Sequence, residues 1–145
     1  MAFESKKNNV TEQLCTTVKL PKMVRVRQSF DPTHIEPADL PAVVRGELLR
    51  EAVRQNIKPG MSIGITCGSR GIANIAIIIK TIVDFVKECG AEPFVFPAMG
   101  SHAGAKAEGQ RGIIEGYGVT EEAMGAPIRA SMDTEVIAHS KSGLE

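Results

Sequence analysis

Residues 61–75 read MSIGITCGSRGIANI, and this stretch decides the fold of the chain. Over residues 61–67 apolar side chains alternate with small or polar ones, which is the period of a β-strand that buries one face. Gly68-Ser69-Arg70-Gly71 interrupts the alternation, because paired glycines are typical of a turn. The apolar run over residues 72–88 then predicts a helix that is mostly buried.

The following residues repeat this order of elements. Gly90 is placed to end the helix over 72–88, residues 93–98 predict a second strand, and a helix over 105–115 follows the turn that opens at Gly100. A strand, a helix and a strand in succession predict a parallel sheet, joined by a right-handed crossover. We therefore predict an α/β fold in three layers, a mostly parallel sheet with helices on both faces in a Rossmann-like arrangement.

Shorter elements are predicted around this unit. Residues 1–10 are interpreted as a flexible tail and residues 11–145 as a single α/β domain, incomplete at its carboxyl end. Within that domain we expect strands over 14–20 and 23–29, a helix over 40–55 capped by Asp39, a helical turn that starts at Thr120, and short strands over 127–131 and 135–139.

Composition argues against several classes of function. Seventeen basic and seventeen acidic residues cancel, and the chain has one Tyr and no Trp, which disfavours nucleic acids and anionic membranes as partners. Three widely spaced cysteines predict neither a disulfide framework nor a metal site. The polar first nine residues resemble no signal peptide, and no apolar stretch reaches the length of a membrane span. We expect a soluble, cytoplasmic protein.

Two glycine-flanked loops carry the candidate chemistry. Gly68-Ser69-Arg70-Gly71 and the sequence GSHAG at residues 100–104 both follow strands, and the carboxyl edge of a parallel sheet is where ligands bind. Arg70 offers a planar fork for a carboxylate or phosphate, while Gly68, Ser69 and Gly71 would let a ligand approach the backbone at a helix N-terminus. An exposed arginine on an ordinary turn is the alternative.

His102, in the second loop, is a candidate general acid or base near neutral pH. A capping or merely exposed histidine is the alternative interpretation of this position. Cys67 is interpreted as a core residue, unless Arg70 perturbs its thiol, and Asn74 is near enough to the first loop to touch a ligand. The polarity of Glu108 and Gln110 is explained by a position on the surface of a helix. His34 and His139 are interpreted as structural or solvated.

An ordered set of motifs resembles the amino-terminal domain of the lactate racemase family, over about residues 22–143. The motifs are GSRGIANI at 68–75, GAEP at 90–93, PAMGSHAGA at 97–105, AEGQ at 107–110, YGVTEE at 117–122 and Pro127-Ile128.

The resemblance implies an isomerase that racemises or epimerises 2-hydroxy acids with a nickel pincer nucleotide, tethered to a lysine, as hydride acceptor. Two histidines of the family exchange the hydroxyl proton, and His102 matches one of them. Arg70 matches the arginine that holds anionic groups of the substrate or cofactor. Gly68, Ser69 and Gly71 would then contribute to cofactor binding.

Two departures from the family pattern limit what carries over. Cys67-Gly68-Ser69-Arg70-Gly71 stands where lactate racemase has an Asp-x-Thr-Arg-Pro type loop, which leaves the identity of the hydroxy acid open. Family enzymes are also longer, and their tethering lysine, nickel-binding histidine and second acid/base histidine lie downstream; His139 does not match them.

We therefore expect the chain to be the amino-terminal part of such an enzyme, inactive alone. Its expected partners are the missing carboxyl-terminal part, a small 2-hydroxy acid and a second copy associating through an exposed sheet edge. The alternatives are a stand-alone anion-binding or metabolite-binding α/β domain without catalysis, and a scaffold whose loops are degenerate.

Overall fold

The computed structural model describes residues 16, 19 and 22–141, in two units that divide between residues 33 and 34. In the first unit, residues 22–33 form no helix or strand, and Met23, Val24 and Val26 are exposed. The prediction of a strand over 23–29 is therefore wrong. The apolar and polar residues do alternate there, but they pair with no other strand of the described residues. The strand predicted over 14–20 falls almost entirely outside the described residues.

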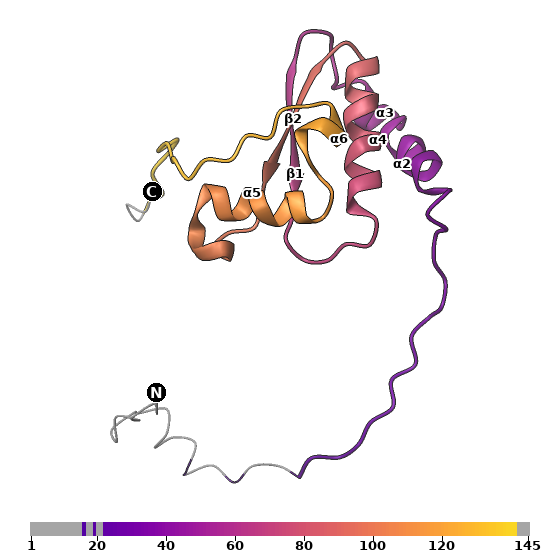
Figure 1. The fold of residues 1–145 in the computed structure, drawn as a ribbon, viewed down its shortest axis with the longest axis vertical. Coiled ribbons are helices and arrows are strands. Elements are labelled where there is room, and N and C mark those ends of the chain that lie inside the picture. Colours follow the sequence, from indigo (N-terminus) through magenta and orange to yellow (C-terminus); the bar gives the residue numbers. More distant parts are fainter. Residues whose placement is uncertain (1–15, 17–18, 20–21, 142–145) are drawn as a thin grey trace. The chain divides into compact units, whose positions relative to one another are not determined.

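The second unit holds the regular structure (Figure 1). Its elements are α2 (Leu40–Leu48), α3 (Glu51–Arg54), β1 (Ser62–Cys67), α4 (Ile75–Glu88), β2 (Glu92–Pro97), the 3-10 turn η1 (His102–Ala105), α5 (Ala107–Gly116) and α6 (Glu121–Met124).

The sheet is small and parallel. β1 pairs with β2 so that Ser62 lies opposite Glu92 and Cys67 opposite Pro97. On the other edge of β2, Val95 forms a bridge with Ile128, which is all that appears of the strand expected over 127–131. The predicted order of strand, helix and parallel strand is confirmed. The strand expected over 135–139 is not formed.

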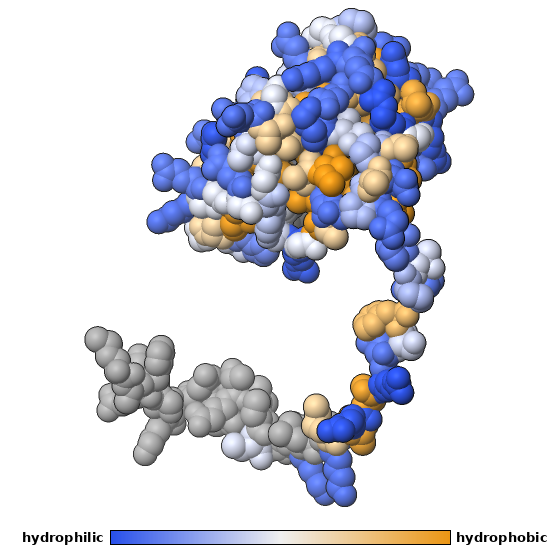
Figure 2. Space-filling model, turned by 45° about the vertical axis from the view of Figure 1, so that its right-hand side comes forward, coloured by the Kyte–Doolittle hydropathy of each residue, from blue (hydrophilic) through white to orange (hydrophobic). Residues whose placement is uncertain are grey.

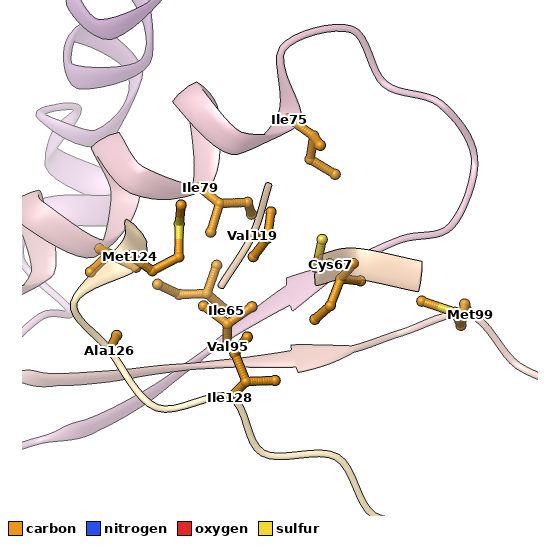
Figure 3. Packing of buried hydrophobic residues seen from close by; sticks show 12 residues of the cluster. Ile65, Cys67, Ile75, Ile79, Val95, Met99, Val119, Met124, Ala126 and Ile128 are labelled. Carbon is orange, nitrogen blue, oxygen red and sulfur yellow. The ribbon is translucent and has the colours of Figure 1, made fainter. Parts of the chain in front are cut away.

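One face of the sheet makes the core. Figure 3 shows Ile65, Cys67 and Val95 pointing from the strands toward Ile75 and Ile79 of α4, which runs beside both strands. Ile114 of α5, Val119 and Met124 of α6 belong to the same buried cluster. A second cluster, made of Ile57, Phe85, Val86, Cys89 and Ala91, continues this core. Removing these apolar surfaces from water is the main force that holds the helices against the sheet.

The opposite face of the sheet is built from rings. A Cβ on Gly64 would lie 2.9 Å from ring atoms of both Phe94 and Phe96, so any side chain at this position in β1 would force the rings to move. The guanidinium of Arg129 lies 4.2 Å from the centre of the Phe94 ring. Neither buried cluster of the described residues extends onto this face. The structure is thus α/β with a small parallel sheet, and the three-layer arrangement is not confirmed.

The helix expected over 40–55 is interrupted. Leu48 ends α2, and Arg50 has an extended backbone before α3 begins. Asp39 is the residue before α2, but its side chain makes no capping hydrogen bond. Two features explain this, since Asp39 has a helical backbone and Pro41, early in the first turn, has no N–H to donate.

The remaining helix predictions are close to the observed bounds. Gly90, with φ of 78°, follows the end of α4, and Thr120 accepts a hydrogen bond from the Ala123 N–H at 3.1 Å as a cap of α6. The start of α4 is an exception, because it begins at Ile75 after a left-handed Asn74, three residues later than expected. No helix among the described residues is long and apolar enough to cross a membrane, and hydrophilic residues prevail on the face in Figure 2.

Truncating the core at Ile114 should destabilise the fold. Ile114 is fully buried, so Ile114→Ala leaves a cavity and should lower the free energy of unfolding by about 2–5 kcal/mol. Ile137→Ala is the matched control, because Ile137 is 94% exposed and its loss should change stability by less than about 0.5 kcal/mol. Urea denaturation followed by circular dichroism measures both, and equal midpoints would contradict the packing described here.

The Arg45–Glu88 ion pair should contribute to stability against acid. Two hydrogen bonds of 3.0 and 2.5 Å join the two side chains, and they hold the pKa of Glu88 below its ordinary 4.5. This contribution is present above pH 4.5 and is lost as the pH falls through the lower pKa of the folded protein. Glu88→Gln should therefore make the melting temperature fall less steeply on acidification. Glu122→Gln, at an exposed position of α6, should keep the slope of the parent protein, and identical slopes for all three proteins would contradict the expectation.

Candidate functional site

Both glycine-flanked loops leave the same edge of the sheet. Cys67 and Pro97 lie opposite each other at the ends of β1 and β2, and the Ala98 N–H donates to the Cys67 carbonyl at 2.8 Å just beyond them. The loops border an open cavity of about 410 Å³, lined by Gly68, Ser69, Arg70, Ile72, Ala98, Met99 and His102. The predicted meeting of the two loops is thus confirmed.

Ser69 and His102 are in direct contact. The Ser69 hydroxyl is hydrogen-bonded to Nδ1 of His102, across 33 positions of sequence. A hydroxyl either donates or accepts, so it serves the ring in any protonation state. Nε2 of His102 has no hydrogen-bond partner among the described residues. Contact at one ring nitrogen orients the imidazole and leaves the other nitrogen for a ligand, which is the arrangement that acid/base histidines need.

The Ser69 hydroxyl was expected to face a bound ligand, but in the structure it contacts His102. It is engaged by His102, so any contact of Ser69 with a ligand falls to its backbone or to the donor or acceptor capacity that the hydroxyl keeps beside the bond to His102. Because α4 begins at Ile75, the N–H groups of Gly68–Gly71 are not the N-terminus of that helix. The expected anion site at a helix N-terminus is therefore wrong in its structural basis, and the loop itself lines the cavity.

Arg70 is the charged group of the cavity. Its side chain is exposed, and it forms no ion pair or hydrogen bond with any residue that the structure describes. By contrast, Arg45 is paired with Glu88, and Arg111 is paired with Glu115 at 2.7 Å. An unpaired guanidinium beside an oriented imidazole can hold an anionic ligand with two parallel hydrogen bonds.

The second loop has an unusual backbone. Ala103, Gly104 and Ala105 are all left-handed, with φ of 52°, 67° and 54°. For an alanine this conformation costs roughly 1–2 kcal/mol, so the surrounding structure must impose it. Gly109 of α5 is part of that surrounding, because a Cβ there would lie 2.7 Å from the Cβ of Ala103. The helix and the loop are therefore packed backbone against side chain.

Two residues that hold the loops were missed by the sequence prediction. Gln110 is buried, and its Nε2 donates to the Gly100 carbonyl at 2.7 Å and more weakly to the His102 carbonyl at 3.4 Å. The prediction of helix-surface polarity for Gln110 is wrong. The Tyr117 hydroxyl donates to the Ser69 carbonyl at 2.7 Å. A signal existed for Gln110, which stands four residues before Ile114 and so shares its buried helix face.

The other candidate residues lie outside the cavity. Asn74 is exposed before α4, Glu108 is exposed on α5, His139 is exposed, and His34 contacts Glu36 at 2.8 Å. Cys67 is fully buried in the core, and burial raises the pKa of its thiol. The core interpretation of Cys67 is confirmed. Within the described part of the chain, no group of three His, Cys, Asp or Glu side chains could hold a metal ion.

A larger cavity, of about 500 Å³, lies between α5 and residues 128–131. Its two arginines are already engaged: Arg111 contacts Glu115 and Glu121, and Arg129 covers the Phe94 ring. It contains no histidine or cysteine. The cavity between the glycine loops is smaller but has the free cation and the oriented imidazole, and we assign the candidate site to it.

Comparisons of the chain with protein-family models, with curated proteins and with solved structures give no match. The resemblance to the lactate racemase family therefore depends on the motifs quoted above.

The thiol of Cys67 should be unreactive in the folded protein. It has no exposed surface and a raised pKa, so little thiolate forms near neutral pH and reagents cannot reach it. Iodoacetamide labelling with peptide mass mapping should find Cys67 modified only after unfolding in urea. Labelling of Cys67 at the same rate with and without urea would show that the thiol belongs to the open site.

Proposed function

We propose that the cavity between the two loops binds an anionic 2-hydroxy acid and that His102 exchanges a proton with its hydroxyl group. The observation that supports this most directly is that unpaired Arg70 and the Ser69–His102 pair line the same cavity. In this proposal Arg70 binds the carboxylate and the backbone of Gly68 and Ser69 borders the bound molecule, while Gly71, which does not line the cavity, acts only through the shape of the loop. The chain is then the amino-terminal part of a racemase or epimerase.

In this proposal the imidazole of His102 exchanges a proton with the hydroxyl group of the bound acid. The proposed step uses the neutral tautomer with its proton on Nδ1, which then donates to the Ser69 hydroxyl oxygen, while the lone pair of Nε2 accepts the hydroxyl proton of the hydroxy acid. The resulting imidazolium keeps its bond to Ser69 and later returns the proton to the same oxygen. The Ser69 hydroxyl fits both states of the ring, because it accepts a hydrogen bond from Nδ1–H in the neutral ring and in the imidazolium.

Inversion at the carbon also requires an acceptor for hydride. In the family that the motifs resemble, a nickel pincer nucleotide supplies this chemistry. The family's tethering lysine and nickel-binding histidine are not matched by the motifs of this chain, and no three His, Cys, Asp or Glu side chains gather into a metal site among the described residues. We therefore assign to this chain only binding of the acid and movement of the proton.

The wider proposal follows from the same resemblance. The complete enzyme would have three layers, a mostly parallel sheet with helices on both faces. Its carboxyl-terminal part would cover the face that bears Gly64, Phe94 and Phe96. It would act in the cytoplasm. Self-association of the isolated chain through the exposed edge of β1 belongs to the same proposal.

A second candidate is an anion-binding domain without catalysis. It is supported by the fact that the cation and the loop backbone suffice for binding, whereas among the described residues only His102 lines the cavity as an acid or base. The two candidates differ in one property. A proton-exchanging site should distinguish a hydroxy acid from the same acid without its hydroxyl, while a simple anion site should not.

The fluorescence of Tyr117 should report binding. Tyr117 is the sole tyrosine of a chain without tryptophan, and it is hydrogen-bonded to the first loop. Titration with lactate should give a saturable change, and Arg70→Ala should weaken binding by about tenfold or more through loss of charge-assisted hydrogen bonds. Arg50→Ala, at an exposed arginine of the α2–α3 junction, is the matched control and should bind as the parent does.

The same titration separates the two candidates. With propionate in place of lactate, a proton-exchanging site should bind more weakly, and His102→Ala should abolish this preference. Equal affinities for lactate, propionate and phosphate in the parent protein would favour the plain anion site. Unchanged lactate binding in Arg70→Ala would reject both.

A further inference from the structure

Side chains of α5 and its carboxyl-terminal end form hydrogen bonds with both loops of the candidate site. The bonds reach Ser69 and His102, the two residues whose side chains contact each other. The Tyr117 hydroxyl, at the end of α5, donates to the carbonyl of Ser69. Nε2 of Gln110, in the first half of α5, reaches the carbonyls of Gly100 and His102. The backbone carbonyls of Ser69 and of His102 are thus each bound by a side chain from the same short stretch of sequence.

The bonds of Gln110 form a bridge over the turn that carries His102. An amide nitrogen has two hydrogens, so one Nε2 can serve the carbonyls on either side of Ser101. Gln110 is only 6% exposed, and water therefore competes little for these bonds. An apolar side chain could fill the same volume, but it would leave the carbonyls of the turn without this donor.

The loop needs such a restraint. Two of the three residues after His102 are left-handed alanines, Ala103 and Ala105, and their conformation is unfavourable without support. Gly109 allows α5 to approach Ala103, and Gln110, the next residue, makes the hydrogen bonds. Close approach and donor therefore come from consecutive positions of one helix.

We infer that Gln110 and Tyr117 are positioning residues, which set the Ser69–His102 contact through the backbone carbonyls of the two loops. The catalytic meaning of this inference rests on the proposed role of His102. The positioning itself can be measured without any ligand.

The test is nitrogen NMR of the imidazole rings in four variants of the ¹⁵N-labelled chain. Ser69→Ala defines the Nδ1 shift of His102 without its partner. Tyr117→Phe removes one oxygen, and Gln110→Glu replaces the donor amide by oxygen at nearly constant shape. Both should move the His102 Nδ1 signal toward the Ser69→Ala value. Glu108→Gln, on the exposed face of the same helix, should not, and His34 and His139 serve as internal references.

The inference is overturned if His102 keeps the signals of the parent protein in both positioning variants, or if all three histidines shift together. If Gln110→Glu does not fold, the parent protein still decides. The side-chain amide protons of Gln110 should exchange with solvent about tenfold or more slowly than those of exposed Gln55, and equal rates would overturn the bridge.

The positioning by Gln110 and Tyr117 and the proposed binding of a hydroxy acid can be rejected independently of each other. A His102 signal that depends on Gln110 and Tyr117, in a chain that binds no hydroxy acid, supports the positioning and rejects the proposed function. Binding that depends on Arg70, with a His102 signal indifferent to both residues, rejects the positioning alone.

Discussion

The register between β1 and β2 is the constraint on which the other features depend. With Cys67 opposite Pro97, the side chains of Ile65 and Val95 lie on one face, where α4 covers them. A slip by one residue would turn these apolar faces toward water, so burial and hydrogen bonding specify the same pairing. Because the strands are parallel and end together, the loops that follow them must start side by side. The candidate site is therefore a consequence of the core.

The finer geometry of the site has a different source. Ser69 and His102 come from the two loops, but their carbonyls are bound by Tyr117 and Gln110, which follow both loops in the chain. The strands bring the loops near each other, and α5 sets their backbones. Buried Gln110 finds acceptors in the carbonyls of Gly100 and His102, and these bonds hold the turn that leads into left-handed Ala103.

Much of the fold and part of the site could be predicted from local patterns. Alternation with period two located β1, and a long apolar run located α4, because each element must present one apolar side to the core. Thr120 was found because a cap acts on its own helix. The prediction of a strand over 23–29 was wrong, because alternation shows only that a segment could pair. Whether a partner strand is present depends on residues far away in the sequence, and local alternation carries no information about them.

Local sequence patterns were enough to locate β1, β2, α4 and α5 and to place Arg70 and His102 after strands whose ends meet. Three features of the site follow from long-range packing instead: the Ser69 hydroxyl binds His102, Arg70 has no partner in the described part of the chain, and Gln110 is buried. The physical reason is range. Periodicity and turn residues act over a few positions, whereas the hydrogen bond between Ser69 and His102 joins atoms 33 residues apart, and only packing of the sheet and α5 brings them together.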